Sequence, residues 1–491
     1  MKSIDIHKSP FFKEEHFGEP IPNDTHAISV CLPTWKNIID YEERKTKSLQ
    51  KMKSGYPRFV YHPLINLINT KFNNDIKNYE IQIYPTFKSA QKAANFIKFK
   101  HPNSNIVIEK KSLVYAIKYS KEYCQTAKVY WQLTGEGISS RYAAALLNNE
   151  SVNSPKKNLH KIQSRLSNIL NITPDNIFIY PSGMSAIYAA MNAVKKIHPD
   201  RKFCQFSFPY GDTLKLLEQF NSKETLFFPH GNEEDFEKLN KIIFKTPLAG
   251  LFTEFPSNPL LRSVDLKKLR ILANNFRFPI ITDETLSALI NTNVNLFSDI
   301  STISLTKYFS GVGNVMGGAL IINPDQPYYH LLKPIIESEF DEEMVFDDDI
   351  NELFKNSFNI EDRISKINQN TLAIVDYLKH HKSIEKVWHP SVTDKSIYDN
   401  FKINKNGYGG VLSFTLKNAD EKTISFYDKL PISKGPNLGT SYSLCCPFVM
   451  LAHYNELEWA ESMGASKWLI RLSVGLEQPD DLINRLNSAL N

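Results

Sequence analysis

Cysteine is scarce in this chain, and its placement argues against two kinds of site. The five cysteines among 491 residues form no CxxC pair and no spacing typical of metal ligands, and their number is odd. Usage of this kind is typical of a reducing compartment in which thiols stay unpaired. We therefore expect neither a metal site nor a disulfide framework.

Long apolar runs and a strong excess of one charge are also missing. No uninterrupted apolar stretch is long enough to span a bilayer. The first residues, MKSIDIHKSPFF, lack the apolar core of a secretory signal and the Arg- and Ser-rich character of a transit peptide. A net charge of +5 is mild for this length and favours neither nucleic acid nor a membrane as partner. We therefore expect a cytoplasmic protein.

Length and composition indicate a globular protein with several domains. Hydrophobic residues make up 42% of the chain and charged residues 23%, as in ordinary globular proteins, and 491 residues exceed a single core. The changes of pattern along the chain predict four parts: an extended N-terminal arm (1–60), a small mixed α/β insert (61–130), a large domain (131–325) and a smaller C-terminal α+β domain (326–491). The acidic stretch at 326–360 is expected to be a connector.

Strands and helices alternate from about residue 150. NIFIYPS, LAGLFTEF, PIITDE and ISTISLT have the character of strands, and GMSAIYAAMNAVKKI and DLKKLRILANNF have helical spacing. This alternation predicts an α/β fold with a parallel sheet and crossover helices. Ligands of such sheets bind at the carboxyl ends of the strands, so chemistry is expected there.

A lysine and an aspartate follow two of these strand ends. Lys307 lies in SLTKYFSG after one strand, and Asp283 ends PIITD in another. A lysine can hold the aldehyde of pyridoxal 5'-phosphate (PLP) as a Schiff base. An aspartate can pair with the protonated ring nitrogen and keep the ring an electron sink. A single lysine is far more often a solvated surface residue, so the interpretation depends on its companions.

Two further motifs suit a flat, phosphorylated ligand. Gly183 lies in YPSGMSAI, where a strand passes through a glycine into a helix whose N-terminus can bind an anion. The alternative is an ordinary helix start. Tyr210, in FPYGDT, stands in a turn where an aromatic ring can stack on a cofactor, or else is a tyrosine of the core.

Asn258 and Arg471 complete the set of candidates. Asn258 ends a strand in TEFPSNP, where its amide can bind a phenolic oxygen or simply form a turn. Arg471 lies inside the apolar strand KWLIRLSVGLE, and a buried arginine needs an anionic partner. That partner is either a substrate carboxylate, which the guanidinium fork suits, or an internal salt bridge.

The order and spacing of these motifs resemble the Cys/Met-metabolism family of PLP-dependent enzymes. SGMSAI, YGDT, EFPSNP, TDET, SLTKYFSG, NVMGG and RLSVGLE follow one another as in that family. FGEPIPNDTHAISVCLPTW, WQLTGEGISSR and LAHYNELEWA resemble its fungal branch of cystathionine gamma-synthases, which extends the likeness to nearly the whole chain. The implied fold is an aspartate-aminotransferase-like (fold type I) α/β large domain with a mainly parallel sheet and a smaller C-terminal α+β domain.

The resemblance implies PLP as the cofactor and a role for each matching residue. Lys307 is then the Schiff-base lysine and proton shuttle, and Asp283 pairs with the pyridine nitrogen. Tyr210 stacks on the ring and acts as an acid/base. The remaining implied contacts are the phosphate on the backbone of Gly183 and Met184 and on the hydroxyls of Ser304 and Thr306, the ring oxygen on Asn258, and the substrate α-carboxylate on Arg471.

The arm has a role of its own in this resemblance. GYPRF resembles the family's Tyr-x-Arg segment, which reaches the cofactor phosphate of a neighbouring subunit. Tyr56 and Arg58 are therefore expected to act in trans, in a homodimer or homotetramer with shared active sites.

The implied reaction is γ-replacement, in which an O-acylhomoserine and L-cysteine give cystathionine during methionine biosynthesis. A cystathionine lyase or an O-acylhomoserine sulfhydrylase would use the same core residues, and a non-catalytic paralogue would keep only the fold. Two departures from the family pattern bear on this choice. Asn437 stands where a serine usually helps to place the lysine and the substrate, and Val312 and Gly313 replace a carboxylate near the rim of the site.

Overall fold

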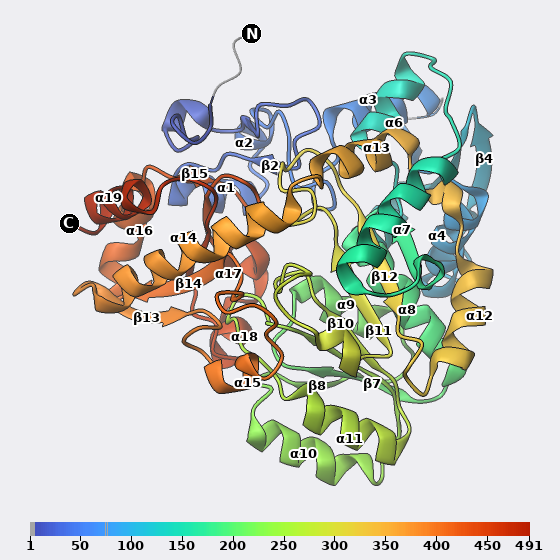
Figure 1. Cartoon of the computed structure of the whole chain (residues 1–491). Coiled ribbons are helices and arrows are strands. Elements are labelled where there is room, and N and C mark those ends of the chain that lie inside the picture. Colours follow the sequence, from blue (N-terminus) through green and yellow to red (C-terminus); the bar gives the residue numbers. More distant parts are fainter. Residues whose placement is uncertain (1–4, 74, 76) are drawn as a thin grey trace.

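A seven-stranded sheet forms the centre of the molecule in the computed structural model, which describes residues 5–73, 75 and 77–491 (Figure 1). The strand order is β6–β12–β11–β10–β9–β7–β8. Their bounds are β6 (Ile177–Tyr180), β7 (Lys202–Phe206), β8 (Leu226–Phe228), β9 (Leu248–Glu254), β10 (Ile280–Asp283), β11 (Ile300–Ser304) and β12 (Gly318–Ile322). Only β12 runs antiparallel to its neighbours. The expected mainly parallel sheet is confirmed.

Both faces of this sheet are buried beneath helices. The covering helices are α7 (Lys156–Leu170), α8 (Gly183–Ile197), α9 (Gly211–Gln219), α10 (Glu233–Ile243) and α11 (Leu266–Phe276). Successive residues of β12 enter opposite cores: Leu320 packs with α8, and Ile321 packs with the α7 side. Burial on both sides explains why these strands are almost continuously apolar.

Helix α8 leads from β6 back across the sheet. Ser182 caps its N-terminus by accepting a hydrogen bond from the Ser185 backbone N–H. Met184, Met191 and Val194 recur at helical spacing and are buried in the core shared with β11 and β12. The helix start is therefore fixed at the carboxyl end of β6.

A second sheet organises the C-terminal part. Five strands lie in the order β13–β14–β17–β16–β15, and all neighbours are antiparallel except β15 and β16. The strands are β13 (Ile384–Trp388), β14 (Val411–Leu416), β15 (Ser433–Lys434), β16 (Leu444–Pro447) and β17 (Ile470–Ser473). The helices of this part are α14 (Ile360–His380), α15 (Lys395–Asp399), α16 (Ala419–Lys429), α17 (Phe448–Ala452), α18 (Leu457–Ser462) and α19 (Pro479–Leu490).

A small antiparallel sheet, β3–β5–β4, lies in the region of the expected insert. Its strands are β3 (Tyr79–Tyr84), β4 (Val107–Lys111) and β5 (Val114–Ser120), and the helices beside it are α3 (Pro63–Phe72), α4 (Phe87–Lys100), α5 (Cys124–Thr134) and α6 (Ser140–Leu147). Helix α4 packs on α5, and α5 in turn packs on α8 and α9. This part is therefore attached to the large sheet through α5.

The N-terminal arm is more structured than the sequence predicted. It holds β1 (Pro20–Ile21), β2 (Ser29–Val30), α1 (Trp35–Glu42) and α2 (Thr46–Leu49). Trp35 and Ile38 are buried among residues of α16 and α19, and Figure 1 shows the blue arm beside the red C-terminal elements. The expectation of an extended arm was wrong in this respect, because α1 gains its stability from the domain that it packs on.

The expected acidic connector is also folded. Residues 326–360 contain α12 (Tyr329–Glu339), which packs on α8, and α13 (Asp347–Asn356), which packs on α7. Three aspartates in the first turn of α13 suit the positive end of the helix. Their acidity therefore marks a helix start.

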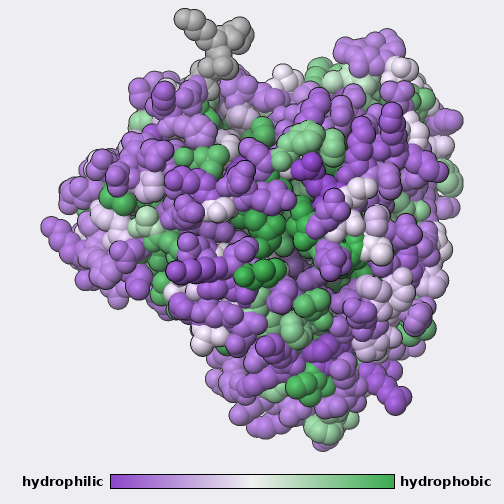
Figure 2. All heavy atoms as spheres, viewed as in Figure 1, coloured by the Kyte–Doolittle hydropathy of each residue, from purple (hydrophilic) through white to green (hydrophobic). Residues whose placement is uncertain are grey.

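Figure 2 shows one face of the molecule, which is mostly hydrophilic, with apolar residues gathered near its middle. Within the described part of the chain, no helix combines the length and the apolar character needed to cross a membrane.

Candidate active site

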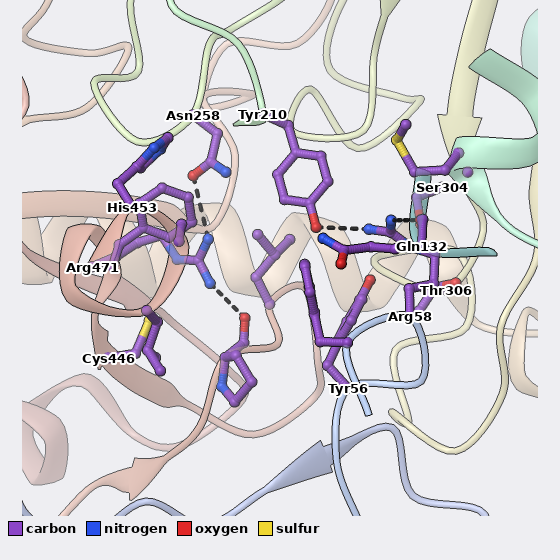
Figure 3. Close-up of a pocket in the computed structure, with 18 of the residues that line it drawn as sticks. Tyr56, Arg58, Gln132, Tyr210, Asn258, Ser304, Thr306, Cys446, His453 and Arg471 are labelled. Carbon is purple, nitrogen blue, oxygen red and sulfur yellow. Dashed lines mark hydrogen bonds between the residues drawn. The ribbon is translucent and has the colours of Figure 1, made fainter. Parts of the chain in front are cut away.

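The carboxyl ends of β7, β9, β10 and β11 border one pocket of about 330 Å³ (Figure 3). Its opposite wall comes from the arm and from the C-terminal domain. All the predicted site residues except Asn437 line this pocket, and Asn437 contacts Lys307 directly. The predicted site residues therefore lie around one pocket at this edge of the sheet.

Lys307 lies in the turn that follows β11 and is 8% exposed. Its Nζ donates to Asn437 Oδ1 at 2.5 Å and to the Tyr56 hydroxyl at 3.1 Å. Burial lowers the pKa of the Lys307 amine, and the cations of Arg471 and Arg58 act in the same direction, while Tyr56 opposes them. The amine is therefore closer to neutrality than an exposed lysine.

Tyr56 has the opposite character to Tyr210. Burial raises the pKa of the Tyr56 phenol, but Lys307 and Arg58 together outweigh that effect and lower it. For Tyr210, burial prevails and raises the pKa well above its ordinary value, despite the nearby Arg58. Tyr56, whose hydroxyl lies 3.1 Å from Lys307 Nζ, is therefore a second candidate for exchanging protons, beside Tyr210, to which the resemblance gave that role.

Arg58 joins the arm to the pocket of its own chain. Its Nη2 donates to the Tyr210 hydroxyl at 2.6 Å, and its Nη1 donates to Asp212 Oδ2 at 2.7 Å and to the Gln132 carbonyl at 2.8 Å. Figure 3 shows Tyr56, Arg58 and Tyr210 converging. In the single chain described, Tyr56 and Arg58 line the pocket of the chain that carries them, and their expected contribution to a neighbouring subunit stays a prediction.

The connection on either side of this segment explains the placement. Before it, Lys53 N donates to the Gly18 carbonyl and Ser54 Oγ to the Ala27 carbonyl. After it, Gln82 Nε2 donates to the Tyr61 hydroxyl, and His62 Nε2 lies 2.8 Å from the Thr25 carbonyl oxygen. Both flanks are thus held by the same chain within a few residues of Arg58.

Asp283 is the last residue of β10 and faces the pocket. Burial raises the pKa of its carboxyl, although hydrogen bonds from Thr285 oppose the rise. Asp283 lies beside Glu254 in the register of β9 and β10. Burial, followed by the Asp283 charge, raises the pKa of Glu254 well above its ordinary value. A cation beside Asp283 would relieve this repulsion.

An anion-sized cradle lies between α8 and the end of β11. Gly183 is the first residue of α8, where backbone N–H groups have no partner within the helix. A Cβ at Gly183 would stand 2.9 Å from Ser304 Cβ, so only glycine leaves this space open. Met184, Ser304 and Thr306 border the same pocket, although the Thr306 hydroxyl also donates to the Gly317 carbonyl.

Arg471 is 3% exposed and has no carboxylate partner among the described residues. Its Nη1 donates to Asn258 Oδ1 at 3.3 Å, its Nη2 donates to the Pro436 carbonyl at 2.7 Å, and its guanidinium stacks on Phe448. The internal salt bridge considered for Arg471 is absent within the described part of the chain. The guanidinium is therefore available to an anionic ligand.

The two departures from the family pattern meet in space. A Cβ at Gly313 would lie 2.7 Å from the Tyr442 hydroxyl and 3.5 Å from Asn437 Nδ2, and Gly313 has a φ of +84°. Asn437 is 1% exposed, and its Nδ2 lacks a hydrogen-bond partner in the described structure. Gly313 therefore leaves room for the Tyr442 hydroxyl and lies close to the amide of Asn437.

Four residues that shape this site were not predicted from the sequence. Asp212 and Gln132 hold Arg58, and Glu254 accepts hydrogen bonds from the backbone N–H groups of Tyr210 and Asn258. His453 lines the pocket, with its Nδ1 2.8 Å from Glu456 Oε1. All four lie inside motifs that carried the resemblance. The motifs could therefore have pointed to these residues, but the sequence alone does not show which side chains they contact.

Comparison with family models decides the relationship. Residues 154–491 match the model of the Cys/Met metabolism PLP-dependent enzymes, and residues 62–139 match the N-terminal domain of fungal trans-sulfuration enzymes. The chain belongs to the Cys/Met metabolism family of PLP-dependent enzymes. It is an enzyme of the cystathionine gamma-synthase-like type, its cofactor is PLP, and its family supports a role in trans-sulfuration.

Curated relatives match nearly the whole chain. A cystathionine gamma-synthase from Neurospora crassa is 31% identical, over 96% of this chain and 97% of its own length. The cystathionine gamma-synthase-like protein ankD from Aspergillus thermomutatus is 30% identical, over 96% and 93%. The solved cystathionine gamma synthase of Xanthomonas oryzae pv. oryzae shares the fold, with a TM-score of 0.59 and 21% identity, over 68% of this chain and 85% of that one.

The pocket fits PLP. The space that Gly183 leaves open at the N-terminus of α8 suits the phosphate. Asp283, held among buried groups beside Glu254, suits a protonated ring nitrogen. The buried, pKa-lowered amine of Lys307 suits the aldehyde. The three groups follow the carboxyl ends of β6, β10 and β11 and border the same pocket.

Proposed function

We propose that this enzyme catalyses γ-replacement on an O-acylhomoserine with L-cysteine as the thiol, forming cystathionine for methionine biosynthesis. The observation that carries the proposal is that the guanidinium of Arg471, which has no carboxylate partner among the described residues, lies in the same pocket as the amine of Lys307. In such an arrangement, Arg471 binds the carboxylate of an α-amino acid, and Lys307 removes the proton from its α-carbon. The names of the relatives support cystathionine as the product.

The reaction balances without an external oxidant or reductant. The bond between the γ-carbon of the acylhomoserine and its ester oxygen breaks, and a bond between that carbon and the cysteine sulfur forms. The acyl group leaves as a carboxylate, and the thiol proton passes to solvent. When bound, PLP supplies an electron sink for the negative charge that develops at the α-carbon.

The residues of the chain then bind the substrate and move its protons. Arg471 holds the α-carboxylate, and Asn258 orients the guanidinium. Lys307 Nζ removes the α-proton of the substrate and moves protons between the substrate carbons. The Tyr56 hydroxyl, 3.1 Å from Nζ, passes protons to and from that amine. Asn437 Oδ1, 2.5 Å from Nζ, keeps the amine on the substrate side.

The remaining residues hold the cofactor in this proposal. The backbone of Gly183 and Met184, with the hydroxyls of Ser304 and Thr306, would bind the phosphate. Arg58, fixed by Asp212, would place its charge beside the same group, and it holds the hydroxyl of Tyr210, whose ring would face the cofactor.

We also propose a cytoplasmic homodimer or homotetramer with the four-part division set out above. The free cysteines, four of them buried, support a reducing compartment. The separate family matches at 62–139 and 154–491 support a boundary between the insert and the large domain.

The test is an assay of the purified holoenzyme with O-acetyl-, O-succinyl- and O-phosphohomoserine, each with cysteine, with sulfide and with no thiol. Mass spectrometry then distinguishes cystathionine, homocysteine and 2-oxobutyrate. Cystathionine as the main product supports the synthase. Homocysteine formed preferentially would favour a sulfhydrylase, and 2-oxobutyrate formed from added cystathionine would favour a lyase. A protein that binds PLP and turns over no substrate would be the non-catalytic paralogue.

A further inference from the structure

The mouth of the pocket carries a second group of charged side chains, apart from the residues around Lys307. Glu42 and Arg44, at the end of α1, line the same pocket as Lys307 and Arg471. Lys128 of α5 is not among the residues that line the pocket, but it lies near enough to them for its charge to act on Glu42 and for Arg44 to act on it. We call Glu42, Arg44 and Lys128 the mouth cluster.

The mouth cluster is unsatisfied. Within the described residues, none of its three side chains takes part in a hydrogen bond or an ion pair. Their neighbours are paired: Glu43 binds Lys45 and accepts from the Tyr454 hydroxyl, and Lys215 across the pocket binds Glu456. Unused charges among paired ones indicate a site whose partner is a ligand.

The mouth cluster is partly shielded from solvent. Burial raises the pKa of the Glu42 carboxyl to about 7, although Arg44 and Lys128 oppose the rise. Burial likewise lowers the pKa of Lys128 to about 8. Charges in such surroundings interact with a ligand more strongly than charges in open water.

The cluster is also held in place. Trp35 and Ile38 of α1 are buried against the C-terminal domain, and the Tyr454 hydroxyl donates to Glu43 Oε1 at 2.8 Å. Arg44 has a φ of +54°, so the chain turns sharply after α1. Its side chain is exposed, which leaves the guanidinium open to solvent and ligand.

A mixed cluster of one carboxylate and two cations suits a zwitterion. The proposed product has two amino-acid head groups, and Arg471 accounts for only one of them. We propose that the mouth cluster is the binding site for the amino-acid head group of the incoming thiol, with Arg44 and Lys128 on its carboxylate and Glu42 on its ammonium. This inference rests on the proposed function and names the residues that would bind its second substrate.

The test removes each charged group in turn from the thiol, and separately removes the side-chain charge proposed to bind that group. Cysteamine lacks the carboxylate of cysteine, and 3-mercaptopropionate lacks its ammonium. We would measure kcat/KM for both and for cysteine, each relative to hydrogen sulfide, which has neither group. The variants are Arg44→Gln, Arg44→Lys and Glu42→Gln, with Lys47→Gln and Glu14→Gln as charge-matched controls on exposed parts of the arm.

Wild type is expected to prefer cysteine over both analogues by about 10- to 100-fold, the value of a hydrogen bond between charged groups. Arg44→Gln should lose most of the preference over cysteamine, and Arg44→Lys should recover part of it. Glu42→Gln should lose the preference over 3-mercaptopropionate. The two controls should keep the wild-type selectivities.

Two results would overturn the inference while the proposed function stands: a wild type that forms thioethers with no preference for cysteine, or variants whose selectivities match wild type. If the wild type releases no acyl group from any O-acylhomoserine, the proposed function fails and the inference falls with it.

Discussion

At the scale of single residues, Lys307 is the group on which the chemistry depends. Its amine is buried, has a lowered pKa, and lies within hydrogen-bond distance of Tyr56 and Asn437. Lys307→Ala should lower kcat by about 10²- to 10⁴-fold, the usual contribution of a positioned acid/base. Lys405→Ala, at an exposed loop position, should retain wild-type kcat. Steady-state rates with circular dichroism as a check on folding would measure both; a rate within tenfold of wild type for Lys307→Ala would contradict this role.

The opposite pKa shifts of Tyr56 and Tyr210 predict different pH profiles for variants at the two positions. Because Lys307 and Arg58 lower the pKa of Tyr56, its phenolate forms at lower pH than in free tyrosine, and activity should rise as pH passes through that pKa. Tyr56→Phe should flatten this acidic limb of kcat/KM. Tyr210→Phe should lower kcat/KM but leave the midpoint of the limb in place, because the pKa of Tyr210 is raised. A limb that disappears with Tyr210 instead would reverse the assignment.

At the scale of secondary structure, the start of α8 is the element that decides cofactor binding. A methyl group at Gly183 would press on Ser304, with a Cβ–Cβ separation of 2.9 Å. Gly183→Ala should therefore weaken PLP binding by roughly tenfold, the lower end of the cost of overpacking. Equilibrium dialysis and the PLP-induced rise in Tm measure this directly. Ala189→Ser, at a partly exposed position further along α8, should bind PLP as wild type does; equal affinity in both variants would argue against the cradle.

The same elements show what the sequence could and could not predict. The strands before Gly183, Asp283 and Lys307 were predictable because continuous apolar runs with helices between them have one common solution, a buried parallel sheet. The residues at their carboxyl ends were therefore brought together correctly. The helices α12 and α13 were missed because acidity was taken as a sign of a connector, although Leu332 and Ile336, and likewise Ile350 and Leu353, recur at helical spacing.

Contacts between distant segments had no local signal. The pairing of Arg58 with Asp212 and Gln132 joins residues up to 154 positions apart. Nothing in the spacing of GYPRF or YGDT predicts that these two segments are in contact. The contact between Gly313 and Asn437 is of the same kind, and it makes two separate departures from the family pattern a single local feature.

At the scale of the whole molecule, the arm of the described chain places Tyr56 and Arg58 in that chain's own pocket, which predicts that each chain supplies these two residues to itself. It packs on the C-terminal domain before Arg58 and joins the insert after it, with hydrogen bonds to the same chain on both sides. Mixed assemblies test this arrangement. Co-expressed Lys307→Ala and Arg58→Ala chains should show no more activity than the two variants alone, because neither chain has a complete site.

Differently tagged chains would establish that any mixed assembly has formed. An assembly that regains a substantial part of wild-type activity would mean that Arg58 acts across a subunit boundary. The in-chain arrangement would then be wrong, while the roles of Lys307 and Arg471 would stand.

The most direct test of the central claim is the visible absorption spectrum of the purified protein, recorded with PLP before and after O-acylhomoserines are added. We predict a yellow band that depends on Lys307 and that changes with at least one of the acetyl and succinyl esters. Cysteine should then restore the original band as substrate is consumed. A protein that shows no band after PLP is added, or a band that no acylhomoserine alters, would contradict the account.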